Sequence, residues 1–186
     1  GLLAKNMKQH AVANDLWDES QMGTREGTLG TVDHLLVDRA VLREVVEKRR
    51  NADIVYYDYR KAYDLVPHQW MEMVLAWMGL SSKTLATFRK LQSLWRTRLE
   101  TYQGGKKMIG RIIQFRRGFF QGDSLSPVAF CLCEVPIGMM MSKTSGYRFG
   151  ERQGGGGVKV THSYYIDDLR TIQENKRKQE LLNQTV

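Results

Sequence analysis

Apolar residues recur at helical spacing through most of the first 50 residues of the chain. They lie three and four positions apart in 2–17 and again in 32–50, which predicts two helices. The Gly- and Thr-rich stretch 19–31 between them predicts a loop. The expected buried face of the second helix comprises Leu35, Leu36, Ala40, Val41 and Val45. No capping residue precedes Leu2, so we expect a further segment upstream.

The pattern then changes to a run of β-branched and aromatic residues, 52–59, which predicts a strand. Pro67 suits the first turn of the helix that follows, because a helix needs no backbone N–H at that position. Gly79 can end this helix in the left-handed conformation, and Ser81 or Ser82 can cap the next one. A strand followed by two helices is therefore expected.

A predicted hairpin and an apolar helix come next. The segment 96–115 indicates two strands joined by the Gly104-Gly105 pair, which favours a tight turn. The run 128–141 is apolar nearly throughout and predicts a buried helix. Pro136 lies inside it and is expected to kink or break the helix, because proline has no N–H to donate.

The last part of the chain predicts a second hairpin, with strands 158–165 and 169–173, and a short helix in 175–186. After residue 50 the expected order is strand, helix, helix, hairpin, helix, hairpin, helix. This order favours an α+β domain that has a mainly antiparallel sheet with helices on one face.

Composition is typical of an ordinary folded, soluble protein. The 186 residues are 42% hydrophobic and 26% charged, enough for one well-buried domain. No apolar run approaches the ~20 residues of a membrane span, and no signal peptide is visible, so we expect an intracellular protein without membrane contact. Cys131 and Cys133 are the only cysteines. Without a nearby histidine they make a poor zinc site and are expected to be buried thiols in a reducing compartment.

Positive charge is concentrated in one stretch of the chain. Residues 83–117 hold ten basic residues and one acid, so this stretch carries +9 although the whole chain carries +8. Trp95, Tyr102 and Phe115 are interleaved with these charges, and a basic surface with aromatic rings suits a nucleic acid. A solvated helix face followed by a charged hairpin is the alternative interpretation.

Three aspartates form the main candidate for chemistry. Asp167 and Asp168 are adjacent at the tip of the second predicted hairpin, and Asp58 ends the predicted strand 52–59. If the strands are neighbours, Asp58 and Asp167 converge, and hard carboxylate oxygens of this kind suit Mg²⁺. Two such ions would support an in-line phosphoryl transfer. Solvated turns and strand ends would also explain each aspartate singly, so spacing alone leaves both interpretations open.

Four segments resemble, in order and spacing, signature motifs of reverse transcriptases, in the style of the non-LTR retrotransposon branch. They are QMGTREGTLGTVDHLL (21–36), DYRKAYDLVPHQW (58–70), RGFFQGDSLSP (117–127) and YIDD (165–168). The resemblance covers nearly the whole chain, and four motifs in the right order are far more specific than any one of them.

The resemblance implies an RNA-directed DNA polymerase with a polymerase palm and a partial helical fingers region. Residues 1–50 would be the fingers part, and 51–186 the palm, including a basic helix-hairpin segment at 83–117. The implied partners are an RNA template, a DNA primer and deoxynucleoside triphosphates, with two Mg²⁺ ions, or Mn²⁺, as cofactor. A nuclear location is the family expectation. The sequence indicates no oligomeric state.

The resemblance also assigns roles to individual residues. Asp58, Asp167 and Asp168 would be the catalytic, metal-binding carboxylates. The basic residues that would contact nucleic acid are Arg89, Lys90, Arg96, Arg98, Lys106, Lys107, Arg116 and Arg117.

Five further residues would bind substrates. Tyr63 would be a steric gate that excludes the ribose 2′-hydroxyl, and Gln121 and Gly122 would pack on the incoming nucleotide and the template base. Tyr165 would lie near the primer 3′ end, and Arg25 would contact template or phosphate. A core position for Tyr63, a loop cap for Gln121 and a surface charge for Arg25 are the alternatives.

Several features depart from the family pattern. Thr24 stands where many relatives have phenylalanine, and Ile166 replaces the commoner residues of the YIDD box. The fingers residues that grip the triphosphate would lie upstream of Gly1, and the chain stops before a thumb would be complete. The alternative function is therefore a catalytically incomplete remnant that only binds nucleic acid. An RNA-templated RNA polymerase is disfavoured by Tyr63.

Overall fold

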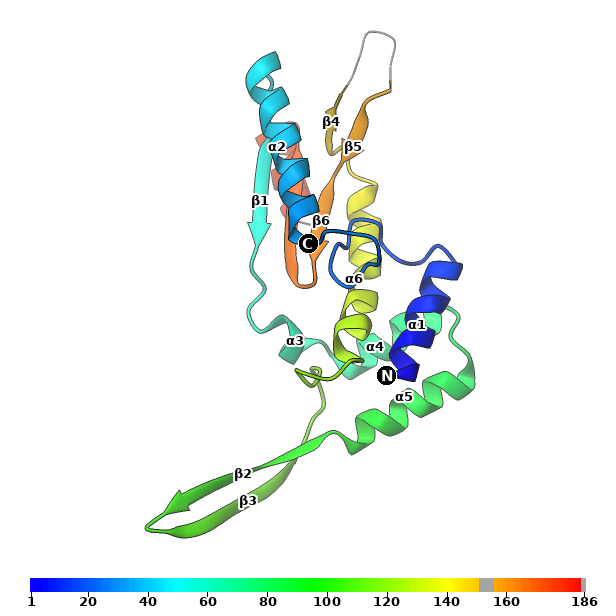
Figure 1. Ribbon diagram of the computed structural model, residues 1–186, viewed down its shortest axis with the longest axis vertical. Coiled ribbons are helices and arrows are strands. Elements are labelled where there is room, and N and C mark those ends of the chain that lie inside the picture. Colours follow the sequence, from blue (N-terminus) through cyan, green and yellow to red (C-terminus); the bar gives the residue numbers. More distant parts are fainter. Residues whose placement is uncertain (151–155, 185–186) are drawn as a thin grey trace.

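The computed structural model describes residues 1–150 and 156–184 (Figure 1). Its helices are α1 (Leu2–Ala13), α2 (Thr31–Lys48), α3 (Ala62–Leu65), α4 (His68–Trp77), α5 (Ser82–Leu94), α6 (Ser126–Ser142) and α7 (Lys176–Asn183). Its strands are β1 (Asp53–Tyr57), β2 (Arg96–Gln103), β3 (Lys106–Gln114), β4 (Tyr147–Phe149), β5 (Val158–Val160), β6 (His162–Tyr165) and β7 (Asp168–Gln173). The predicted α+β class with antiparallel pairing is confirmed.

The central sheet has three antiparallel strands in the order β1-β7-β6. The segment 158–165, predicted as one strand, is divided at Thr161. Its first part, β5, pairs with β4, a strand that the sequence did not predict. Its second part, β6, pairs with β7 and is the edge strand of the central sheet. The loop before α2 continues the sheet beyond β6 through a parallel bridge between Gln21 and Tyr164.

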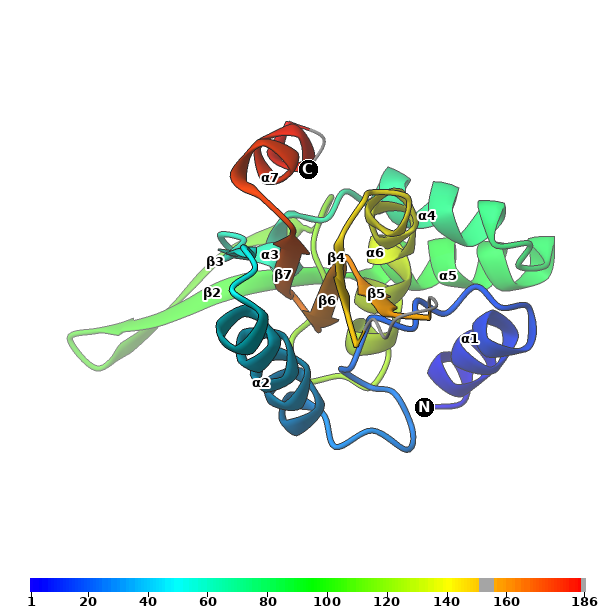
Figure 2. The same ribbon diagram turned by 90° about the horizontal axis from the view of Figure 1, so that it is seen from above.

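Helices cover both faces of this sheet (Figure 2). On one face, Met141 of α6 and Leu182 of α7 pack with Tyr164 and Leu169. On the other face, Val41 of α2 packs with residues of β1, β4 and β7. The helices expected on one face are there, and α2, from the segment assigned to the fingers, covers the second.

The buried face of α2 differs from the prediction. Leu35 and Leu36 are 65% and 56% exposed, whereas Val41 is fully buried. A polar contact explains the rotation of the helix: Asp38 of α2 forms an ion pair with Arg170, which is itself buried in β7. Leaving the buried guanidinium of Arg170 without a partner would cost more free energy than leaving Leu35 and Leu36 exposed to solvent.

The largest apolar core lies where α1, α4, α5 and α6 meet. The predicted caps are confirmed: the Ser81 side chain accepts a hydrogen bond from the Thr84 N–H, and Gly79 has a φ of +77°. Pro136 was expected to kink or break the helix, and of these two outcomes the break is wrong, since α6 continues through it. The indole N–H of Trp70 donates to the carbonyl oxygen of Cys133 (3.0 Å), which links α4 to α6 near this proline.

The β2–β3 hairpin projects from the end of α5 and away from the sheet (Figures 1 and 2). Every position of both strands is exposed. Gly104 and Gly105 form the predicted turn, with φ values of +56° and +77° that suit glycine. Within the described part of the chain, no helix combines the length and apolar character needed to cross a membrane.

Candidate active site

Strand pairing brings the two predicted carboxylate positions to the same end of the sheet. Tyr57 of β1 pairs with Leu169 of β7. Asp58 directly follows Tyr57, and Asp168 directly precedes Leu169, so the same register continued by one residue sets Asp58 opposite Asp168. The condition on which the convergence of these carboxylates depended, that the two strands are neighbours, is met.

The turn between β6 and β7 places its two aspartates in different surroundings. Asp167 is half-buried, and its negative charge adds to the effect of burial in raising the pKa of Tyr63 in α3 and of Glu134 in α6. Asp168 is exposed. Burial and the charge of Arg170 lower the pKa of His34, and Asp168 partly opposes them.

The donor chemistry of this strand end fits a hard divalent cation, because Asp58, Asp167 and Asp168 all offer carboxylate oxygens. In residues 1–150 and 156–184, however, no three His, Cys, Asp or Glu side chains lie close enough to form a metal-binding cluster. The convergence of the three carboxylates on a shared ion therefore stays a prediction. The adjacency of the backbone segments that carry them is a property of the fold.

Three of the predicted substrate-binding residues lie together. Tyr63, Gln121 and Gly122 line one open cavity of about 360 Å³, beside the start of α6. The Tyr63 ring is stacked on the ring of Phe130, with ring centroids 4.5 Å apart, and this contact restricts its position. Gly122 has a φ of +97°, which glycine adopts without strain. Ile166 of the carboxylate turn packs against the same apolar core as Tyr63.

Tyr165 and Arg25 lie elsewhere. The Tyr165 ring packs edge-on against His34 at the start of α2, with centroids 6.4 Å apart. Arg25 donates a hydrogen bond to the carbonyl oxygen of Glu19 (2.8 Å) and lines a different cavity of about 700 Å³ between α1 and the following loop. The structure does not bring Arg25 to the cavity at Tyr63.

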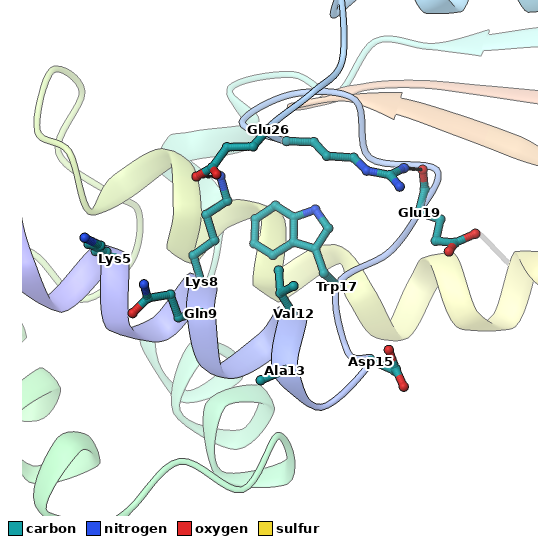
Figure 3. A pocket seen from close by; sticks show the side chains of 10 residues that line it. Lys5, Lys8, Gln9, Val12, Ala13, Asp15, Trp17, Glu19 and Glu26 are labelled. Carbon is teal, nitrogen blue, oxygen red and sulfur yellow. Dashed lines mark hydrogen bonds and ion pairs between the residues drawn. The ribbon is translucent and has the colours of Figure 1, made fainter.

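Figure 3 shows this second cavity at close range. Lys8 of α1 runs beside the Trp17 indole toward Glu26, with which it forms an ion pair of 3.3 Å. The cavity is thus closed on one side by contacts within the protein. It contains none of the three aspartates.

The predicted nucleic-acid-binding residues are all exposed and are distributed over three consecutive parts of the chain. Two of them are on α5, four on the hairpin and two in the loop after it. Arg89 of α5 is paired with Glu72 of α4 (2.7 Å), an acid outside the basic stretch. On the hairpin, Arg98 and Lys107 share Glu100 (3.1 and 2.7 Å). Arg116 and Arg117 line a cavity of about 710 Å³ together with Lys61.

The aromatic part of the basic stretch needs correction. Trp95 is only 8% exposed and packs edge-on against Phe88 and Phe120, and Phe115 also packs on Phe120. These rings are core residues and are not available to stack on bases. Tyr102 is 75% exposed and remains available.

Two buried polar residues near the turn were not predicted. Glu134 lies in α6, where burial raises the pKa of its carboxyl to about 9 and the charge of Asp167 adds to the effect. Gln21 donates a hydrogen bond to Glu134 (3.2 Å). A single acid inside the apolar run 128–141 was a visible signal for Glu134. Gln21 offered no such signal, because its partners Glu134 and Ile166 lie more than 100 residues away.

Comparison with known proteins agrees with this arrangement. The family described as reverse transcriptase (RNA-dependent DNA polymerase) matches residues 2–186. The retrovirus-related Pol polyprotein from the type-1 retrotransposable element R2 of Popillia japonica is 30% identical over 152 residues, which are 81% of this chain and 20% of that protein.

Two solved telomerase structures share the fold. The apo telomerase of Candida tropicalis, truncated from its C-terminal domain, matches 97% of this chain with a TM-score of 0.60 and 15% identity. The telomerase of Candida albicans, in complex with a fragment of telomeric RNA, matches 98% with a TM-score of 0.55 and 9% identity. The chain spans 36% and 31% of their lengths.

Proposed function

The chain belongs to the reverse transcriptase (RNA-dependent DNA polymerase) family, and we propose that it is the catalytic part of a retrotransposon enzyme that copies RNA into DNA. One observation supports this activity above the others. The turn with Asp167 and Asp168 lies at the same sheet end as Asp58, and Ile166 of that turn packs on the same apolar core as Tyr63, which lines a cavity with Gln121 and Gly122. The candidate metal-binding carboxylates and the candidate nucleotide cavity thus belong to one region of the molecule.

In the proposed reaction, the primer 3′-hydroxyl oxygen bonds to the α-phosphorus of a deoxynucleoside triphosphate while the bond from that phosphorus to pyrophosphate breaks. Asp58 and Asp167 would hold two divalent ions, Mg²⁺ or Mn²⁺, with Asp168 as the second acid of the turn. Such ions, when bound, lower the pKa of the attacking hydroxyl and neutralise charge on the leaving pyrophosphate.

Tyr63 would select deoxynucleotides. Its ring cannot move back, because Phe130 is stacked on the other side of it. A nucleotide in the adjoining cavity would therefore bring a ribose 2′-hydroxyl against a fixed aromatic ring. The exposed Gln121 and Gly122 on the same cavity would contact the incoming base pair through side chain and backbone.

The β2–β3 hairpin would contact the template or primer backbone. It carries Arg96 and Lys106, which have no acidic partner among the described residues, and the exposed Tyr102. Cationic side chains on an exposed ribbon bind phosphates, and an exposed ring can stack on a base.

Primer extension on an RNA template tests the proposed activity in the intact natural polypeptide. Asp167→Asn should lower the rate by at least about a thousandfold, because it removes a metal-binding charge. Asp53→Asn is the matched control, since Asp53 lies at the opposite end of β1. Retained synthesis by Asp167→Asn would refute the assignment. Salt-sensitive RNA binding without extension by the unaltered protein would favour the non-catalytic remnant instead.

A further inference from the structure

The turn that carries the two aspartates has an unfavourable backbone conformation. Ile166, between the paired residues Tyr165 and Asp168, has a φ of +58°. A β-branched residue rarely adopts this left-handed conformation, which persists only where the surrounding structure holds it. The two adjacent carboxylates also repel each other, so the turn needs an external support.

Gln21 provides contacts of this kind on both sides of Ile166. Its side-chain oxygen accepts hydrogen bonds from the N–H groups of Ile166 (2.8 Å) and Gly23 (2.9 Å). Its side-chain nitrogen donates to the carbonyl oxygen of Ile166 (3.1 Å) and to Glu134 (3.2 Å). Both donors and both acceptor sites of the amide are used, and the residue is only 2% exposed.

The backbone around Gln21 is itself fixed to the sheet. Met22 donates its N–H to the carbonyl oxygen of Tyr164 (2.8 Å), and Tyr164 donates to that of Ser20 (2.9 Å). Gly23 lies so close to the turn that a Cβ there would be 2.6 Å from Cγ1 of Ile166. The loop before α2 is therefore a rigid backing for the turn.

We propose that Gln21 is a positioning residue for polymerisation, whose amide fixes the backbone of Ile166 and thereby the directions of Asp167 and Asp168. The inference rests on the proposed function. Residues that orient metal-binding side chains typically affect metal affinity or activity by about 10- to 100-fold when they are replaced. Gln21 connects a loop far upstream in the sequence to the catalytic turn.

The chain offers a matched control for a Gln21→Met test. Gln173 is also a buried amide, fully excluded from solvent, at the far end of β7. It accepts hydrogen bonds from Ser145 (3.1 Å) and the Gly146 N–H (3.0 Å) and donates to Thr144 (3.1 Å). Gln173→Met removes a comparable set of contacts without touching the turn.

Three measurements on the intact polypeptide compare these variants: the Tm, the kcat of primer extension, and the Mn²⁺ affinity determined by electron paramagnetic resonance. Both variants should lower Tm. Only Gln21→Met should lower kcat and weaken Mn²⁺ binding, each by about 10- to 100-fold. The proposal would be overturned if, for a similar loss of Tm, Gln21→Met and Gln173→Met had similar kcat values and similar Mn²⁺ affinities.

Rescue by a second substitution separates positioning from general stability. Asparagine tolerates the left-handed conformation, so Ile166→Asn combined with Gln21→Met should recover part of the lost kcat. Absence of any recovery contradicts the proposed role. Gly23→Ala adds a Cβ that would displace Ile166 while the Gln21 amide remains in place, so it should also lower kcat. This variant replaces Gln21→Met in the test if Gln21→Met does not fold.

Failure of the proposed function has a different signature. In that case the unaltered polypeptide would not extend primers at all. Hydrogen exchange at residues 163–169 still tests the support of the turn, since Gln21→Met should speed exchange there and Gln173→Met should not. Unchanged exchange in Gln21→Met would overturn the inference, whatever the activity.

Discussion

The β6–β7 and β2–β3 hairpins are built in opposite ways. In β6–β7, Ile166 occupies a glycine-like conformation and depends on a buried side chain 145 residues away. In β2–β3, two glycines make the turn unassisted, and every strand residue is exposed. The first hairpin is held by the rest of the protein, whereas the second depends on local pairing and on surface ion pairs at Glu100.

The difference between the two hairpins matches the different demands of holding catalytic carboxylates and of binding a nucleic-acid backbone. A site that must hold carboxylates in fixed directions needs long-range support, because the turn alone would relax. A surface that binds a nucleic-acid backbone needs positive charge and an extended shape. A two-stranded hairpin, which is only marginally stable in isolation, can supply both when it is attached to a packed helix.

The largest effect on the supported region should come from the buried ion pair beside it. Arg170→Ala leaves Asp38 without its partner and removes the hydrogen bond to Ser163 (3.1 Å). Breaking a buried pair typically costs about 3–5 kcal/mol in the free energy of unfolding. Chemical denaturation measures this loss. Arg43→Ala, which breaks an exposed pair with Glu47, should have little effect, and equal effects of the two would contradict the comparison.

The buried Glu134 should make stability depend on pH. Its pKa in the folded protein is raised to about 9 by burial, above the ordinary value of 4.5, so the folded state retains a proton that the unfolded state has lost. The free energy of unfolding should therefore fall as pH rises from about 4.5 to 9. Glu134→Gln removes this dependence and should stabilise the protein at pH 8 by roughly 2 kcal/mol or more.

Denaturation at pH 5 and pH 8, in a buffer with a metal chelator, measures that effect. The advantage of Glu134→Gln should shrink at the lower pH. An advantage that is the same at both pH values would show that the carboxyl is not held protonated. Glu100→Gln, on the exposed hairpin, is the control and should not produce a comparable rise with pH.

Tyr63 of α3 and Tyr102 of the β2–β3 hairpin should differ in their effect on substrate selection. Tyr63→Ala removes a ring fixed against Phe130 and should lower the preference for deoxynucleotides over ribonucleotides by about 10- to 100-fold. Tyr102→Ala removes an exposed ring from the β2–β3 hairpin and should leave this preference unchanged. Competition between the two nucleotide types in primer extension measures the ratio. No gain in ribonucleotide use by Tyr63→Ala would refute the steric gate.

The smallest effect is expected on the exposed hairpin. Replacing both Arg96 and Lys106 by alanine should leave Tm nearly unchanged and reduce the slope of log binding constant against log salt by about 2. Filter binding to RNA at several salt concentrations measures the slope. The same double replacement at Lys176 and Arg177 of α7 should not alter it, and an equal change would argue against a specific role of the hairpin.

Local chemistry made much of the fold predictable from sequence. The Gly104-Gly105 turn, the Ser81 cap and the left-handed Gly79 each depend on residues within a few positions of one another. The motif positions at the sheet end were predictable as well, because Asp58 and the aspartate turn both flank recognisable strands.

What the sequence did not predict depends on distant partners. The face of α2 is set by Arg170, Trp95 is buried by rings from other elements, and α6 continues through Pro136. Gln21 likewise acquires its contacts only when the chain folds. A sequence pattern reflects residues that are close along the chain, whereas the environments of these residues are determined by residues that are close only in the folded structure.

The central claim is that Asp58 and the Asp167-Asp168 turn bind a shared divalent ion. Local cleavage by bound Fe²⁺ tests it most directly, because hydroxyl radicals generated at the ion cut the nearest backbone. The account predicts cuts near residue 58 and near residues 167–168 in the same sample, both suppressed by excess Mg²⁺ and both lost in Asp167→Asn. Cleavage at only one of these segments, or at neither, would contradict it.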